Sequence, residues 1–91
     1  MDADEAKRLT DENRIRYQEN MTFILIDQID RLIKQTIDNG EYFTDFYPKV
    51  RKDFDFTDVI NHFKNYRFKI KVNRRDSDYG YDHEISISWG K

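Results

Sequence analysis

The most constraining feature of this 91-residue sequence is one long helical segment at its start. Asp2 followed by Glu5 has the spacing of a helix N-cap and its capping-box partner. Asn39 and Gly40 form a stop signal, in which the glycine supplies the left-handed residue that ends a helix. We therefore expect one helix over roughly Ala3 to Asn39, which would be about 55 Å long at 1.5 Å per residue.

Apolar side chains recur on one broad face of this helix, and they are dense only from Met21 onward. Such a stripe is typical of a helix that packs on a core, so we expect it to cover a sheet. The stripe consists of Ile15, Met21, Leu25, Ile26, Ile29, Leu32, Ile33 and Ile37. Ion pairs between residues four apart should support the exposed side, namely Asp4–Arg8, Glu12–Arg16, Asp27–Arg31 and Asp30–Lys34.

The remainder of the chain predicts a strand, a short helix and a hairpin. The aromatic segment Glu41–Tyr47 is β-prone and is bounded by Gly40 and Pro48. Asp55 then caps an amphipathic helix over about residues 56–66, with Phe56, Val59, Ile60, Phe63 and Tyr66 on its apolar face. Alternation of apolar and polar residues predicts two final strands, over residues 68–73 and 85–89.

Two hairpin registers fit the last two strands. A tip at Asp78-Tyr79 places Phe68 opposite Trp89, whereas a tip at Tyr79-Gly80 shifts the pairing by two residues. The same side chains face inward in both registers, because the side-chain period of a strand is two.

The element order is therefore α-β-α-β-β, and the expected fold is a two-layer α+β domain. A crossover through the second helix makes the first two strands parallel to each other. We expect the final strand between them, antiparallel to both, and the two helices on one face of a three-stranded mixed sheet.

The opening helix is too long for this sheet. Strands of about six residues give a sheet only about 20 Å across, so residues 21–91 form the body and residues 1–20 project from it. Apolar residues that the core does not need predict a partner or subunit contact through this segment, at Leu9, Tyr17, Phe23 and Ile24. The alternative is a frayed helix that is supported only by its own ion pairs.

Charge and cysteine content restrict the cellular compartment and the kinds of partner that we expect. Residues 1–45 carry 11 acidic and 6 basic side chains, and residues 46–91 carry 7 and 10, so an acidic front precedes a basic back. The chain has no cysteine, which fits a reducing compartment, and its charged start does not have the pattern of a signal peptide. We expect a protein that is not secreted and has no membrane partner.

A basic surface is predicted on the first strand of the hairpin. Its four candidate residues are Arg67, Lys69, Lys71 and Arg75, which alternate with the apolar residues of that strand. Such a surface is compatible with nucleic-acid binding, which we consider the less favoured alternative. A solvated or protein-binding face explains the lysines equally well, because outward lysines keep a sheet soluble.

No motif in the sequence predicts catalysis, a cofactor or a metal site. His62 and His83 are the only histidines, and nothing in the sequence places them together. Oxygen-bearing residues alternate over residues 76–84, but this segment departs from a calcium-binding loop because the twelfth position is Ile87. We therefore expect a protein that is not an enzyme.

The second half of the chain resembles small α+β proteins of tailed bacteriophages. The resemblance lies in the helix residues Asp58-Val59-Ile60, the strand 68–72 and the closing strand 85–89, which reads Ile-Ser-Ile-Ser-Trp. Members of that group have a glycine where this chain has Arg67.

The resemblance implies a non-enzymatic phage product, a virion or assembly component that acts as an oligomer in the host cytoplasm or the virion. The alternative is a small phage inhibitor that binds a host defence or nucleic-acid enzyme.

Overall fold

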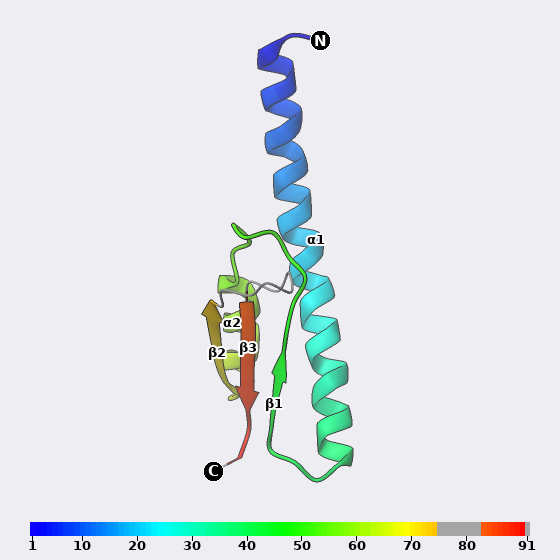
Figure 1. Ribbon diagram of the computed structural model, residues 1–91, viewed down its shortest axis with the longest axis vertical. Coiled ribbons are helices and arrows are strands. Elements are labelled where there is room, and N and C mark those ends of the chain that lie inside the picture. The colour runs from blue at the N-terminus through cyan, green and yellow to red at the C-terminus, as the bar shows by residue number, and fades with distance from the viewer. Residues whose placement is uncertain (75–82, 91) are drawn as a thin grey trace.

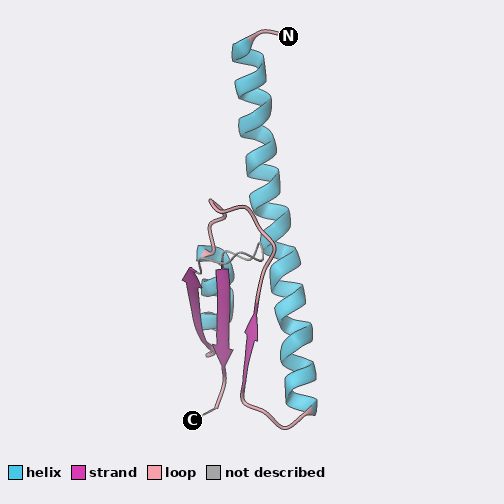
Figure 2. Ribbon diagram, in the orientation of Figure 1, coloured by secondary structure: helices cyan, strands magenta, loops and turns pink. Residues whose placement is uncertain are grey.

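The computed structural model describes residues 1–74 and 83–90. A long helix runs along a small sheet and continues well past it. A short helix lies behind two strands of the sheet (Figures 1 and 2). The elements, in chain order, are α1 (Ala3–Asp38), β1 (Phe43–Phe46), α2 (Thr57–Asn65), β2 (Lys69–Arg74) and β3 (His83–Ser88). This order confirms the α+β class and the predicted succession of elements.

The sheet has the order β1-β3-β2, so the last strand lies in the middle as expected. Both hydrogen-bonded pairs are antiparallel, and the expectation of a mixed sheet was wrong. β1 and β2 run in the same direction, but β3 separates them and they never pair. In the hairpin Ile70 lies opposite Ile87 and Val72 opposite Ile85. This is the first of the two predicted registers, although its tip lies outside the described residues.

Both helices pack on the same face of the sheet (Figure 1). The inner side chains of β3 are at the centre of the core, where Ile85 and Ile87 are almost fully buried. The remaining buried apolar residues come from α1, from α2 and from the segment before α2, and they are Leu25, Ile29, Ile33, Phe54, Phe56, Val59 and Phe63.

The two ends of α1 form as the sequence predicts. The Asp2 carboxylate accepts a hydrogen bond from the backbone N–H of Glu5 at 2.8 Å. Gly40 has a φ of 75°, and its N–H donates to the carbonyl of Ile37 at 2.9 Å. The N–H of Glu41 donates to the carbonyl of Thr36 at 3.1 Å, which completes a Schellman motif.

Three residues of the predicted apolar faces are not in the core. Ile15 and Ile37 on α1 and Tyr66 after α2 are 60%, 54% and 69% exposed. Instead, Thr22 and Thr36 are buried in the stripe, because their hydroxyls donate to the carbonyls four residues earlier and need no other partner.

The ion pairs within α1 keep the predicted spacing of four residues, but their partners match the prediction only in part. Arg31 pairs with Asp27 at 3.0 Å, as expected. Arg8, however, pairs with Glu12 and not with Asp4. All of these side chains are well exposed, so each pair contributes less than about 1 kcal/mol.

The start of α2 differs from the predicted N-cap. The helix begins at Thr57, two residues after the predicted cap Asp55, and the Asp55 carboxylate accepts hydrogen bonds from the N–H and hydroxyl of Thr57 at 2.9 and 2.6 Å. After the helix, Arg67 has a φ of 69°. Among the described residues, neither helix is long and apolar enough to cross a membrane.

Candidate interaction surfaces

The N-terminal part of α1 extends beyond the body of the molecule (Figure 1). The first α1 side chain that bonds to a distant part of the described chain is Arg14, which forms an ion pair with Asp53. We call residues 3–13 the arm. The projecting segment is therefore shorter than the predicted residues 1–20, because the segment between β1 and α2 reaches back to hold the next turn of the helix.

Tyr17 belongs to the body and not to the projecting surface. Its hydroxyl accepts a hydrogen bond from the N–H of Arg51 at 3.0 Å, and the Arg51 guanidinium lies 4.3 Å from its ring centroid. Its ring meets Phe54 edge to face at 6.4 Å. The ring and the hydroxyl of Tyr17 are therefore both in contact with residues of its own chain. We remove Tyr17 from the set of partner-binding candidates.

The other three predicted contact residues keep part of their surface in water. Phe23 is 74% exposed and Ile24 is 45% exposed, whereas Leu9 on the arm is half-buried. An exposed phenylalanine on a helix is a large apolar surface to leave in water. Phe23 and Ile24 therefore remain candidates for contact with another molecule.

A polar connection that the sequence did not reveal anchors α1 to the start of α2. The Gln18 side chain donates to the carbonyl oxygen of Asp55 at 2.7 Å and accepts from its N–H at 3.1 Å. Hydrogen bonds from the side chain and backbone of Thr57 hold the pKa of Asp55 below its ordinary value. This arrangement fixes the direction in which the chain enters α2.

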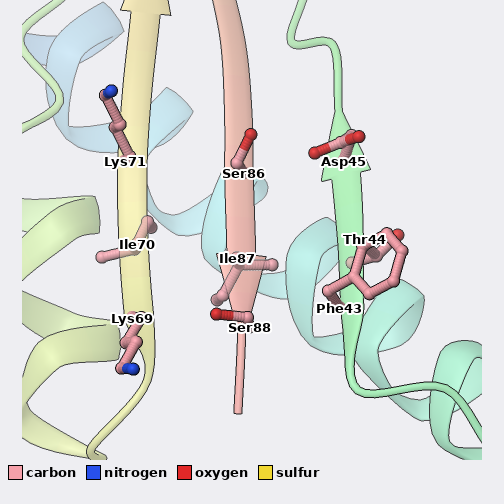
Figure 3. A pocket seen from close by; sticks show the side chains of 9 residues that line it. All are labelled: Phe43, Thr44, Asp45, Lys69, Ile70, Lys71, Ser86, Ile87 and Ser88. Carbon is pink, nitrogen blue, oxygen red and sulfur yellow. The ribbon is translucent and has the colours of Figure 1, made fainter. Parts of the chain in front are cut away.

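Three of the four predicted basic residues, Arg67, Lys69 and Lys71, lie within the described ranges. Lys69 and Lys71 lie on β2 and are exposed on the face of the sheet opposite the helices (Figure 3). Arg67 precedes that strand in a left-handed turn, and Arg75 lies outside the described residues. Of the described residues in this set, Lys69 and Lys71 share one face of β2.

These lysines form one wall of an open hollow on the outer face of the sheet (Figure 3). Register places Lys69, Ser88 and Phe43 side by side across the three strands. Lys71, Ser86 and Asp45 form the next row. The central serines are small, so larger side chains stand on both sides of β3.

We call these six residues the outer trough, and the hollow over them has a volume of about 220 Å³. The wall formed by Phe43 and Asp45 was not anticipated. Alternation in the aromatic segment 41–47 could have revealed it, since Phe43 and Asp45 lie two residues apart and share a face.

A second hollow lies between the two helices. It has a volume of about 430 Å³ and is lined by Asp30 of α1, by residues of α2 and by the turn that follows it; the full lining is Asp30, His62, Phe63, Tyr66 and Phe68. The His62 ring contacts Phe63 and Tyr66 at centroid distances of 4.9 and 5.2 Å.

The second histidine is buried. His83 lies at the start of β3, and its ring centroid is 4.9 Å from that of Phe56. Among the described residues, its Nδ1 has no hydrogen-bond partner. Within residues 1–74 and 83–90, no group of three acidic or histidine side chains is arranged to hold a metal ion.

Comparison of the chain with protein-family models, with curated proteins and with solved structures found no match.

Proposed function

We propose that this chain is a non-enzymatic protein–protein interaction domain that self-associates through its arm. The observation that carries the proposal is that α1 continues for about three turns beyond its first bond to the body, at Arg14. The molecule is 56 Å along its longest axis but only 17 Å along its shortest. This elongated shape places part of the surface of α1 far from the core.

Energetics favour a partner for the arm. The 11 residues of the arm continue a helix that is already nucleated in the body, so they are held by propagation alone and not by packing on the sheet. Its ion pairs, Lys7–Asp11 and Arg8–Glu12, lie at the surface and add little. Contact with another molecule would supply the burial that the arm lacks, and the exposed Phe23 would extend the contact toward the body.

The resemblance to small tailed-phage proteins suggests the biological role in which self-association would be used. A virion or assembly component works in many copies, and self-association through a projecting helix suits that role. Inhibition of a host enzyme is the alternative setting, in which a monomer would bind one partner with the same surface.

Nucleic-acid binding is a second candidate, because Phe43 lies on the same face as Lys69 and Lys71 and could stack on a base. Asp45 on that face opposes the binding of phosphates. An affinity for a single-stranded oligonucleotide that falls steeply with salt would support this candidate.

Deletion of residues 2–12 tests the main proposal. We expect light scattering to give a multiple of 11.2 kDa for the full chain and the mass of a monomer for the shortened one. Circular dichroism and urea unfolding of the shortened chain serve as controls, since Arg14, Tyr17 and Gln18 are retained and the body should stay folded. Equal association states for the two chains would contradict the proposal.

A further inference from the structure

The hollow between the two helices combines one carboxylate with aromatic rings. Its volume of about 430 Å³ lies within the range of roughly 300–1,000 Å³ that is typical of small-molecule sites. Among the described residues, no lysine or arginine lines it. We call it the aromatic hollow, and its lining consists of Asp30, His62, Phe63, Tyr66 and Phe68. A negative charge beside aromatic rings attracts cations and repels anions.

The turn after α2 sets the inner rings of the aromatic hollow. Arg67 has a φ of 69°, and the N–H of Phe68 donates to the carbonyl of Phe63 at 3.0 Å. The Phe68 ring therefore returns to Phe63 and meets it edge to face, with 5.8 Å between the ring centroids. Phe63 is almost fully buried and holds this pair against the core. Packing thus fixes the inner rings before any ligand arrives.

His62 and Tyr66 form the outer part of the aromatic hollow. They lie four residues apart at the C-terminal end of α2, so both side chains stand on one side of the helix. Their ring centroids are 5.2 Å apart. Tyr66 is 69% exposed, so most of its surface is free to contact a ligand.

Asp30 lines the same hollow and has no cationic partner among the described residues. It lies on α1 next to the buried Ile29, and it is itself partly buried. The predicted ion pair with Lys34 does not form, and none of the ion pairs within the described ranges includes Asp30. A carboxylate that has lost part of its water is stabilised by a positive charge nearby. A bound cation would supply that charge.

The lining of the aromatic hollow selects among cations. A metal ion needs several oxygen ligands, whereas this lining contains a single carboxylate. A primary ammonium is compact and strongly hydrated, so it loses favourable hydration at an apolar site. The methyl groups of a quaternary ammonium give the cation an apolar surface that aromatic rings bind well. The chemistry of the lining therefore favours a quaternary ammonium.

We propose that the aromatic hollow binds a quaternary ammonium group, with Asp30 as its counter-ion and the rings of Tyr66 and Phe68 against its methyl groups. The site is separate from the arm, so it does not depend on the proposed self-association. Such a group occurs free, as in choline, and on proteins, as in trimethyllysine.

Trp89 provides a direct readout of binding. It is the only tryptophan of the chain, and its ring centroid is 5.9 Å from that of Phe68. We expect a saturable change in its fluorescence when choline is added at constant ionic strength, and a matching heat of binding in calorimetry.

Two analogues of choline separate the contributions of charge and methyl groups. The compound 3,3-dimethyl-1-butanol has a carbon in place of the nitrogen and is neutral, and it should bind about tenfold more weakly than choline. Ethanolamine keeps the charge but has no methyl groups, and it should also bind about tenfold more weakly. Choline that binds no better than either analogue, or that does not bind at all, would overturn the proposal.

Two pairs of variants test the named residues. Asp30→Asn should weaken choline binding about tenfold and leave the binding of 3,3-dimethyl-1-butanol unchanged. The control Asp27→Asn removes an exposed carboxylate of the same helix that pairs with Arg31, and it should affect neither ligand. Tyr66→Leu should weaken choline binding about fivefold, whereas Tyr66→Phe keeps the ring and should bind as the wild type does. Normal choline binding by a folded Asp30→Asn chain would overturn the proposal.

The same assay identifies the source of the quaternary ammonium group. A trimethyllysine peptide that binds about tenfold more tightly than choline would assign the aromatic hollow to a modified protein, because the peptide adds contacts of its own. Equal affinities would assign it to free quaternary amines. Deletion of residues 2–12 should leave choline binding unchanged, so a failure of the arm and a failure of the hollow are distinguishable.

Discussion

Gln18 holds the backbone of Asp55 at both of its polar groups, through hydrogen bonds of 2.7 Å to the carbonyl and 3.1 Å from the N–H. The two residues are 37 positions apart in the chain. The Gln18 amide thus satisfies both backbone polar groups of Asp55, as a paired strand would. These two hydrogen bonds join α1 to the segment that leads into α2.

The Gln18 contact predicts a stability effect. Gln18→Ala should lower the free energy of unfolding by about 1 to 2 kcal/mol, because two hydrogen bonds are lost at a partly exposed site. Urea unfolding with an unchanged slope would measure it. Gln35→Ala, an exposed change on the same helix, should alter stability by less than about 0.5 kcal/mol. A similar loss in both variants would show that Gln18 has no special role.

Gly40 should be sensitive to any side chain. Its φ of 75° lies in the left-handed region, and no atom lies within 4 Å of the position that a Cβ would occupy. Gly40→Ala should therefore lower stability by about 1 kcal/mol through backbone strain alone. Gly40→Asn should lower it less, since asparagine tolerates this conformation. Thermal unfolding of both variants would check the order, and an unchanged Gly40→Ala would refute it.

At Arg67, in contrast to Gly40, a substitution should raise stability. Arg67 has a φ of 69° without being glycine, so Arg67→Gly should raise stability by about 0.5 to 1 kcal/mol. Lys64→Gly, three residues earlier and inside α2, should lower it by about 1 kcal/mol. Urea midpoints that fall in both variants would mean that the arginine side chain makes a compensating contact.

Asp55 predicts a dependence of stability on pH. Its pKa is lowered in the folded state by the hydrogen bonds from Thr57. Its contribution is therefore complete above the unfolded value of about 3.9 and is lost as pH falls through the lower folded value. Asp55→Ala should be about 1 kcal/mol less stable than wild type at pH 6, and the difference should shrink below pH 4. A difference that stays constant down to pH 2 would contradict this assignment.

Tyr17 and Phe23 should affect different properties. Tyr17→Phe removes the hydroxyl that accepts from Arg51, so stability should fall by about 1 kcal/mol while self-association is unchanged. Phe23→Ser removes an exposed ring from a helix and should leave stability within about 0.5 kcal/mol. Under the proposed function it should also weaken association. Light scattering and urea unfolding of both variants measure the two effects separately, and a Phe23→Ser chain that associates normally would confine the contact to the arm.

Local sequence patterns specify the order of the elements and the inward faces of the strands. The limits of α1 follow from Asp2 and Gly40, because capping groups act within a few residues of the chain. The side that each residue of β2 and β3 presents follows from a period of two. Local chemistry decides these features, so they are visible before any packing is known.

Tertiary structure decided which of these surfaces are used. Ile15 continues the apolar stripe of α1 but is exposed, although Arg14 beside it is paired with Asp53, whereas Tyr17 is held by the segment that returns from β1. The outer trough exists only because the register of a distant strand sets Asp45 and Lys71 on either side of Ser86. Contacts of this kind join residues that are tens of positions apart, and no local pattern encodes the distance between them.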